Sequence, residues 1–245
     1  MSARVTFATA LRVLRQLRRD PRTLALVFVV PPLLLTLFKY VFDGQPQTFD
    51  RIGGPLVGIF PFVLMFVITS ITMLRERTTG TLERLMTLPL SKLDLLAGYA
   101  LAFGLVAAVQ AVITAAVAFG LLGLDVAGSV VVVVLLAVCN ALLGMSLGLF
   151  ASAFAQSEFQ AVQFMPAFVL PQFLLCGLLV PRDEMPDVLH AVSNVLPLSY
   201  AVDAMRDLST TEGVAPGAWG DVSVVVAEIV LALGLGAATL RRRTP

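Results

Sequence analysis

Long apolar runs separated by short polar segments dominate the chain. Each run meets the roughly 20 residues that a helix needs to cross a bilayer core of about 30 Å. The predicted spans are about residues 24–42, 52–73, 95–124, 126–154, 159–180 and 221–240. The pattern therefore predicts an all-α polytopic membrane protein with six transmembrane helices, forming one domain over residues 1–245.

The predicted spans differ in regularity. The third and fourth exceed the length needed to cross, so we expect tilt or ends that project into the interface. Little more than Gly123 and Asp125 separates them, which predicts a tight antiparallel hairpin. The fifth contains Pro166 and Pro171, which remove helix hydrogen bonds and should kink or split it. The polar segment 181–220 is too long for a simple turn and should contain short helices.

Residues 1–22 combine an apolar stripe with six arginines. Such a pattern is typical of an amphipathic helix that lies in the interface of an anionic leaflet. The alternative is a basic flank that only fixes the orientation of the first span.

Composition agrees with a membrane protein, since 58% of the residues are hydrophobic and 13% are charged, against about 25% charged in soluble domains. The near balance of 17 basic and 16 acidic residues gives no reason to expect a nucleic-acid partner. With a cytoplasmic N-terminus, 13 basic residues fall inside and four outside. This bias predicts cytoplasmic N- and C-termini, a cytoplasmic segment 75–92 and an external segment 181–220.

The cytoplasmic segment reads LRERTTGTLERLMTLPLSKLD over residues 74–94. A short helix should begin at Gly80 or Thr81 and end before Pro89, and Ser91 with Asp94 resembles a capping box for the next span. A short amphipathic helix between two spans suits a contact through which a soluble protein moves membrane helices; the alternative is a solvated loop. The candidate contact residues are Arg75, Glu76, Arg77, Thr81, Leu82, Glu83, Arg84, Leu85 and Met86.

Polar residues inside the spans are the candidates for a substrate path. Glu228 is costly in the last span unless it faces protein or water. It marks either a polar point on that path or a buried hydrogen bond between helices. The amides raise the same question, because amides often hold membrane helices together; they are Gln110, Asn140, Gln163 and Gln172.

Motifs for catalysis or metal binding are scarce. The chain has no phosphate-binding P-loop, and its single histidine excludes an H-E-x-x-H metal site. Residues 144–148 read GMSLG and match G-x-S-x-G, but they lie in a continuous apolar run rather than at a strand-to-helix turn. We therefore interpret Gly144 and Gly148 as a pair that lets two helices approach closely. An intramembrane hydrolase using Ser146 is the less favoured alternative.

Four features together make the chain resemble the ABC-2-type permease family, the membrane subunits of bacterial ABC exporters such as those of daunorubicin-type drug resistance. They are the basic N-terminal helix, RERTTGTLERLMTLPLS at 75–91, CGLLVPRDEMP at 176–186 and NVLPLSYAVDAMR at 194–206. The chain departs from the family at Val195-Leu196-Pro197, where an asparagine often directly precedes the proline.

The resemblance implies roles for three segments. Arg4 to Arg19 looks like the connecting helix, Thr81 to Leu88 like the coupling helix that docks on the ATPase, and Pro181 to Leu208 like external re-entrant helices. It also implies two copies of this chain with two copies of a separate ATPase that binds ATP and Mg, and no cofactor or metal in this chain.

The function implied is export of a hydrophobic or amphipathic drug, antibiotic or lipid across the cell membrane. Export of a lipid-linked polysaccharide, or a sensor that moves no cargo, are the alternatives.

Overall fold

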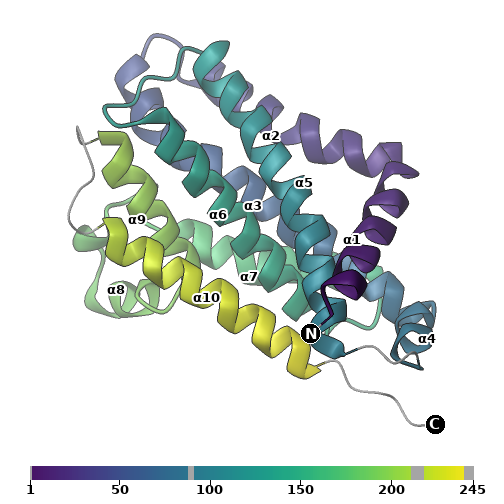
Figure 1. Cartoon of the computed structure of the whole chain (residues 1–245). Coiled ribbons are helices and arrows are strands. Elements are labelled where there is room, and N and C mark those ends of the chain that lie inside the picture. Colours follow the sequence, from purple (N-terminus) through teal and green to yellow (C-terminus); the bar gives the residue numbers. More distant parts are fainter. Residues whose placement is uncertain (1, 88–90, 211–217, 240–245) are drawn as a thin grey trace.

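The computed structural model describes residues 2–87, 91–210 and 218–239, apart from the side chains of Glu83, Met86, Lys92 and residues 208–210. Over these residues the chain is helical and contains no strand, which confirms the predicted all-α class (Figure 1). The elements are α1 (Ala3–Arg18), α2 (Pro21–Val41), α3 (Pro46–Thr78), α4 (Thr81–Thr87), α5 (Lys92–Gly120), α6 (Val130–Ala151), α7 (Glu158–Leu175), the 3-10 turn η1 (Arg182–Glu184), α8 (Asp187–Ser193), α9 (Pro197–Thr210) and α10 (Ala218–Thr239).

Five of the described helices are long and apolar enough to cross a membrane: α2, α3, α5, α6 and α10. The predicted fifth span, α7, is not among them. It has 18 residues, and Glu158, Gln160, Gln163 and Gln172 lower its apolar character. At 1.5 Å per residue it is about 27 Å long, slightly less than the hydrocarbon core.

Several predicted boundaries differ from the structure. Helix α3 begins at Pro46 rather than near residue 52, so most of the segment between the first two predicted spans is helical. The tight turn expected between the third and fourth spans is instead a longer connection over residues 121–129. Helix α7 is a single helix that runs through Pro166 and Pro171 and is not split.

Helices α3 and α6 pack very closely against each other. A Cβ added at Gly144 or Gly148 would lie within 3.0 Å of the α3 backbone at Phe62 or Phe66, closer than real Cβ atoms approach. The hydroxyl of Thr69 on α3 donates to its own-helix carbonyl of Met65 at 2.6 Å and lies 3.2 Å from the Met145 carbonyl on α6. Only glycine permits this separation at the two α6 positions.

The external segment of the prediction forms η1, α8 and α9. The α9 residues Leu198, Ala201, Val202 and Met205 follow helical spacing and are buried in the main hydrophobic core. The first residues of α1, together with α4 and the last turns of α10, lie toward one end of the bundle, whereas α8 and the 121–129 connection lie toward the other (Figure 1).

Candidate functional site

The candidate site lies where α1 crosses the end of α3 just before α4. Glu76, in the last turn of α3, is 6% exposed and forms an ion pair with Arg12 of α1 at 3.1 Å. Gln16, one turn further along α1, donates to the same carboxylate at 3.3 Å. The other terminal nitrogen of Arg12 donates to the Tyr99 hydroxyl of α5 at 2.5 Å. The Arg12–Glu76 pair therefore connects α1, α3 and α5.

Helix α4 is attached to this junction by its apolar side. Leu82 is 4% exposed and belongs to a hydrophobic cluster with Val13 and Leu17 of α1 and Leu95 of α5. Leu85 is half-buried against the same cluster. The predicted stripe on α4 thus faces this chain at Leu82, so Leu82 anchors α4 and is not itself exposed to a soluble partner.

The other candidate contact residues occupy varied positions. Arg75 is exposed and pairs with Glu158 at the start of α7 at 2.7 Å, and Arg84 is exposed on α4. Arg77 is half-buried, with its ε nitrogen lacking a hydrogen-bond partner within the described region. The Thr81 hydroxyl lies 3.0 Å from that of Thr79. The side chains of Glu83 and Met86 lie outside the described residues.

The apolar residues of α1 lie on two different faces of the helix. Ala10, Val13 and Leu17 are buried against the rest of the chain, whereas Phe7 is 66% exposed and Leu11 49% exposed. The stripe predicted as one membrane-facing surface is therefore divided between a protein face and an exposed face.

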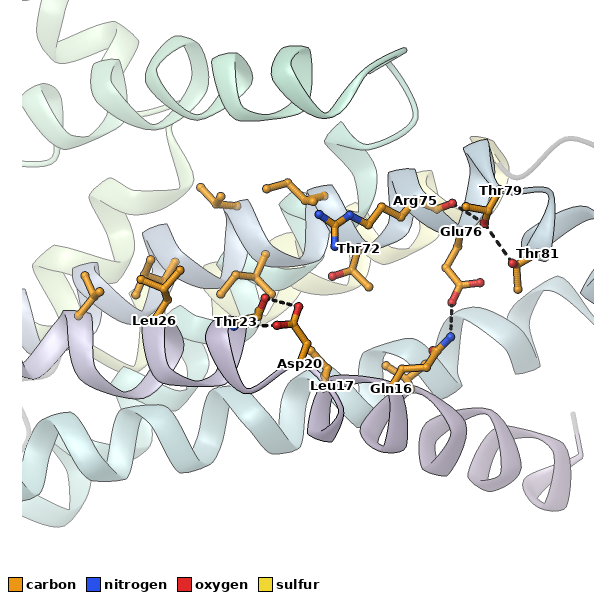
Figure 2. A pocket seen from close by; sticks show the side chains of 16 residues that line it. Gln16, Leu17, Asp20, Thr23, Leu26, Thr72, Arg75, Glu76, Thr79 and Thr81 are labelled. Carbon is orange, nitrogen blue, oxygen red and sulfur yellow. Dashed lines mark hydrogen bonds between the residues drawn. The ribbon is translucent and has the colours of Figure 1, made fainter.

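A cavity of about 540 Å³ opens between the α1–α2 junction and one face of α3 (Figure 2). Asp20 caps α2 there, accepting from the backbone nitrogen of Thr23 at 3.1 Å and from its hydroxyl at 2.6 Å. These hydrogen bonds, led by that from the Thr23 hydroxyl, hold the pKa of the Asp20 carboxyl below its usual value. The sequence signal was Asp-Pro-x-Thr, an N-cap followed by proline at the first helical position.

Comparison with known proteins assigns the chain to a family. The sequence profile of the ABC-2 type transporter family matches residues 4–209. The chain belongs to the ABC-2 type transporter family. It is 25% identical over 213 residues to the probable multidrug ABC transporter permease YbhS of Escherichia coli, covering 86% of this chain and 56% of that protein. It is 28% identical over 167 residues to ABC transporter G family member 20 of Dictyostelium discoideum, covering 67% of this chain and 23% of that protein.

The probable multidrug ABC transporter permease YbhR of E. coli is 27% identical over 153 residues, or 62% of this chain and 42% of its own length. The chain therefore spans between about a quarter and just over half of the length of these relatives. It is a multi-pass ABC-2 membrane permease whose apolar helices agree with that family.

Within this ABC-2 chain, most of the polar residues predicted for a substrate path are hydrogen-bonded between or along helices. Gln110 is fully buried and donates to the Val27 carbonyl of α2 at 3.0 Å. Asn140 is 1% exposed and donates to the Met205 sulfur of α9 at 3.1 Å. Gln172 accepts from the backbone nitrogen of Leu198 at 3.2 Å and so caps α9. Gln163 is exposed.

Glu228 and Ser146 differ in their surroundings. Glu228 is half-buried in α10, and its Oε2 atom is buried without a hydrogen-bond partner among the described residues. Ser146 is fully buried, and its hydroxyl donates to the Leu143 carbonyl of its own helix at 2.8 Å. A hydroxyl held in this way has no access to a substrate, so the ABC-2 structure does not favour the hydrolase alternative.

An ion-paired cluster in the segment predicted to be external was not itself predicted from the sequence. Arg182 of η1 pairs with Asp203 of α9 and donates to Ser193 of α8 at 3.0 Å. It also hydrogen-bonds Asn194 and lies 5.5 Å from the centre of the Tyr200 ring. Arg182 therefore joins η1, α8 and α9.

Proposed function

We propose that this chain is the membrane permease subunit of an ATP-binding cassette exporter and moves a hydrophobic or amphipathic drug, antibiotic or lipid out of the cell. A separate ATPase subunit binds and hydrolyses ATP with Mg²⁺, and the working unit contains two copies of each chain. The segment of α4 faces the cytoplasm, as do both termini, and the chain resides in the cell membrane.

The observation that supports this proposal is the attachment of α4. This helix is seven residues long and lies between two membrane-length helices, α3 and α5. Leu82 fixes it to the α1–α5 cluster, and the buried Arg12–Glu76 pair lies directly before it. A displacement of α4 by a partner is therefore transmitted to α1, α3 and α5 through these close contacts, because closely packed interiors transmit displacement.

The surface offered to the ATPase consists of the outward residues of α4. Arg84 is exposed and Leu85 is half-exposed beside it. This combination of charge with apolar area is typical of the rim and the core of a protein interface. The name of the relative YbhS, a probable multidrug permease, supports a small hydrophobic cargo over a lipid-linked polysaccharide.

The test is co-purification with the ATPase from the native host, followed by ATP hydrolysis and export measurements in vesicles. Arg84→Glu and Leu85→Asp should each lower cargo-stimulated ATP hydrolysis and export roughly tenfold, equivalent to about 1.4 kcal/mol of lost coupling. Arg51→Glu is the matched control, since Arg51 is also exposed but lies in the first turns of α3, at the end of α3 far from α4. Wild-type export by a Leu85→Asp chain that still binds its ATPase would contradict the proposal.

A further inference from the structure

The cavity between the α1–α2 junction and α3 has the size of a small-molecule site. Its volume is about 540 Å³, and ligand sites commonly enclose about 300–1,000 Å³. Three helices each contribute residues spaced by three or four positions, such as Val13 and Leu17 from α1, Thr23 and Leu26 from α2, and Leu64 from α3. One stripe of each helix therefore faces the same space.

The two ends of this cavity differ in polarity. Leu26, Val30, Leu64, Val67, Ile68 and Ile71 make an apolar wall. At the other end lie Gln16, Asp20, Thr23, Arg75, Glu76 and Thr79 (Figure 2). Such a site suits a molecule that has one polar end and one apolar body, because each end finds surroundings of its own kind.

Three charged side chains line the polar end, and two of them are already paired. Glu76 is paired with Arg12, and Arg75 with Glu158. In the part of the chain that the structure describes, Asp20 forms no ion pair; Arg75, which lines the same cavity, attracts it, but Arg75 gives its hydrogen bonds to Glu158. Each of its oxygens accepts one hydrogen bond from Thr23, so further lone pairs remain. Hydrogen bonding favours its ionised form. Asp20 and Glu76 line the cavity as two negative charges and Arg75 as one positive charge, so the lining carries a net negative charge.

The apolar end reaches the outer surface of the bundle. Leu26 lines the cavity and is 58% exposed. Val29 and Leu33 continue this exposed apolar face along α2, which is a membrane-length helix. A hydrophobic molecule dissolved in the bilayer can therefore approach along α2 and enter without first passing through water.

We propose that this cavity binds an amphiphile that carries a protonated amine, with the ammonium group on Asp20 and the apolar body along Leu64, Val67 and Ile68. The proposal rests on the export function above, since it names the class of compound taken up. The binding site lies beside the α1–α3–α4 junction, so an occupied cavity contacts Glu76 and Thr81, the residues that lead into α4. Cargo and ATPase would thus act on the same few turns of helix.

Binding is tested with the full chain in phosphatidylglycerol nanodiscs, without ATPase or ATP. The probe is a dansyl-labelled long-chain alkylamine, and its neutral twin is the same compound acetylated on the amine. The free amine should bind at least tenfold more weakly to Asp20→Asn than to the wild type, whereas the neutral twin should bind both equally. Asparagine retains the helix cap, so an unchanged melting temperature should accompany the loss.

Two further variants complete the design. Asp43→Asn removes an equal charge from the exposed turn after α2 and should leave amine binding unchanged. Leu64→Trp fills the apolar end and should weaken both probes. If added phosphatidylethanolamine displaces the probe, a membrane lipid is a natural source of the amine. If it does not displace the probe, the natural ligand is a free amphiphilic amine.

Equal binding of the amine to Asp20→Asn and wild type, or an equal loss in Asp43→Asn, would overturn the site whether or not export occurs. Conversely, amine binding that depends on Asp20, in a chain that never couples to an ATPase, would overturn the exporter function and leave the site standing.

Discussion

Replacing Arg12 with glutamine should destabilise the protein more than replacing Glu76 with glutamine. Arg12 is 28% exposed, so without its partner it can still reach water and Tyr99. Glu76 is 6% exposed, and without Arg12 its carboxylate keeps the hydrogen bond from Gln16 and its interaction with the Tyr99 hydroxyl but has no counter-charge in this contact. Opposite charges about 4 Å apart attract by about 4 kcal/mol at an effective dielectric constant of about 20. Removing one partner of a buried pair typically costs about 3–5 kcal/mol.

We therefore expect about 3 kcal/mol of lost stability for Arg12→Gln and about 1–2 kcal/mol for Glu76→Gln. The double variant should be more stable than Arg12→Gln alone, because it no longer buries an unpaired charge. The resulting coupling energy between Arg12 and Glu76 is roughly 2 kcal/mol. By comparison, the effects of substitutions at distant sites are normally additive within about 0.5 kcal/mol. The free energy of unfolding is measured by reversible denaturation in mixed micelles.

The Arg75–Glu158 pair serves as the control cycle for this measurement. Its side chains are 55% and 52% exposed, and exposed pairs contribute at most about 1 kcal/mol. Strictly additive effects of Arg12→Gln and Glu76→Gln, or a larger coupling in the exposed pair, would refute the reasoning that one buried carboxylate organises the junction.

Three other outcomes follow from the same structure. Gly144→Ala should lower the free energy of unfolding by about 1–3 kcal/mol, because the new Cβ meets the α3 backbone. Gly234→Ala places its Cβ in open space on α10 and should be neutral or slightly stabilising. Unfolding of the two variants in micelles compares them directly. Gln172→Leu should lower the free energy of unfolding by about 1–3 kcal/mol, because it removes the acceptor for the Leu198 backbone nitrogen. Gln163→Leu, at an exposed position, is the near-neutral reference. Equal effects of the two substitutions would contradict the role of Gln172 as a cap of α9. The hydrogen bonds from Arg75 lower the pKa of the Glu158 carboxyl. The ion pair therefore stabilises the start of α7 above the usual carboxyl pKa, and this stabilisation is lost as the pH falls below about 4. Amide hydrogen exchange at the start of α7 should become faster over that range in the wild type but not in Arg75→Gln.

Hydropathy predicted the presence of the long apolar helices better than the residues at which they begin. The spans at α2, α3, α5, α6 and α10 stand out because an apolar run must exceed a fixed length. The same signal missed the first turns of α3, since a helix continues into polar sequence once proline at Pro46 has started it. The apolar signal is weakest at α7, where three glutamines and a glutamate are interspersed with apolar residues.

The candidate site was only partly visible in the sequence. The α4 stripe was evident from spacing, but spacing does not reveal whether Leu82 faces a partner or its own chain. The roles of Arg12 and Tyr99 depend on contacts between residues more than sixty positions apart. The caps at Ser91 and Asp20 are local, and the first was predicted from its motif.

The tight α3–α6 contact has a mechanical consequence for the whole molecule. Two helices whose backbones touch at Gly144 and Gly148, and which share the Thr69 hydroxyl, have no free volume to slide or tilt past one another. The cavity between the α1–α2 junction and α3 supplies free volume beside α3 instead. The α3–α6 pair should therefore move as a rigid unit. Conformational change should be concentrated where α1 and α2 meet α3.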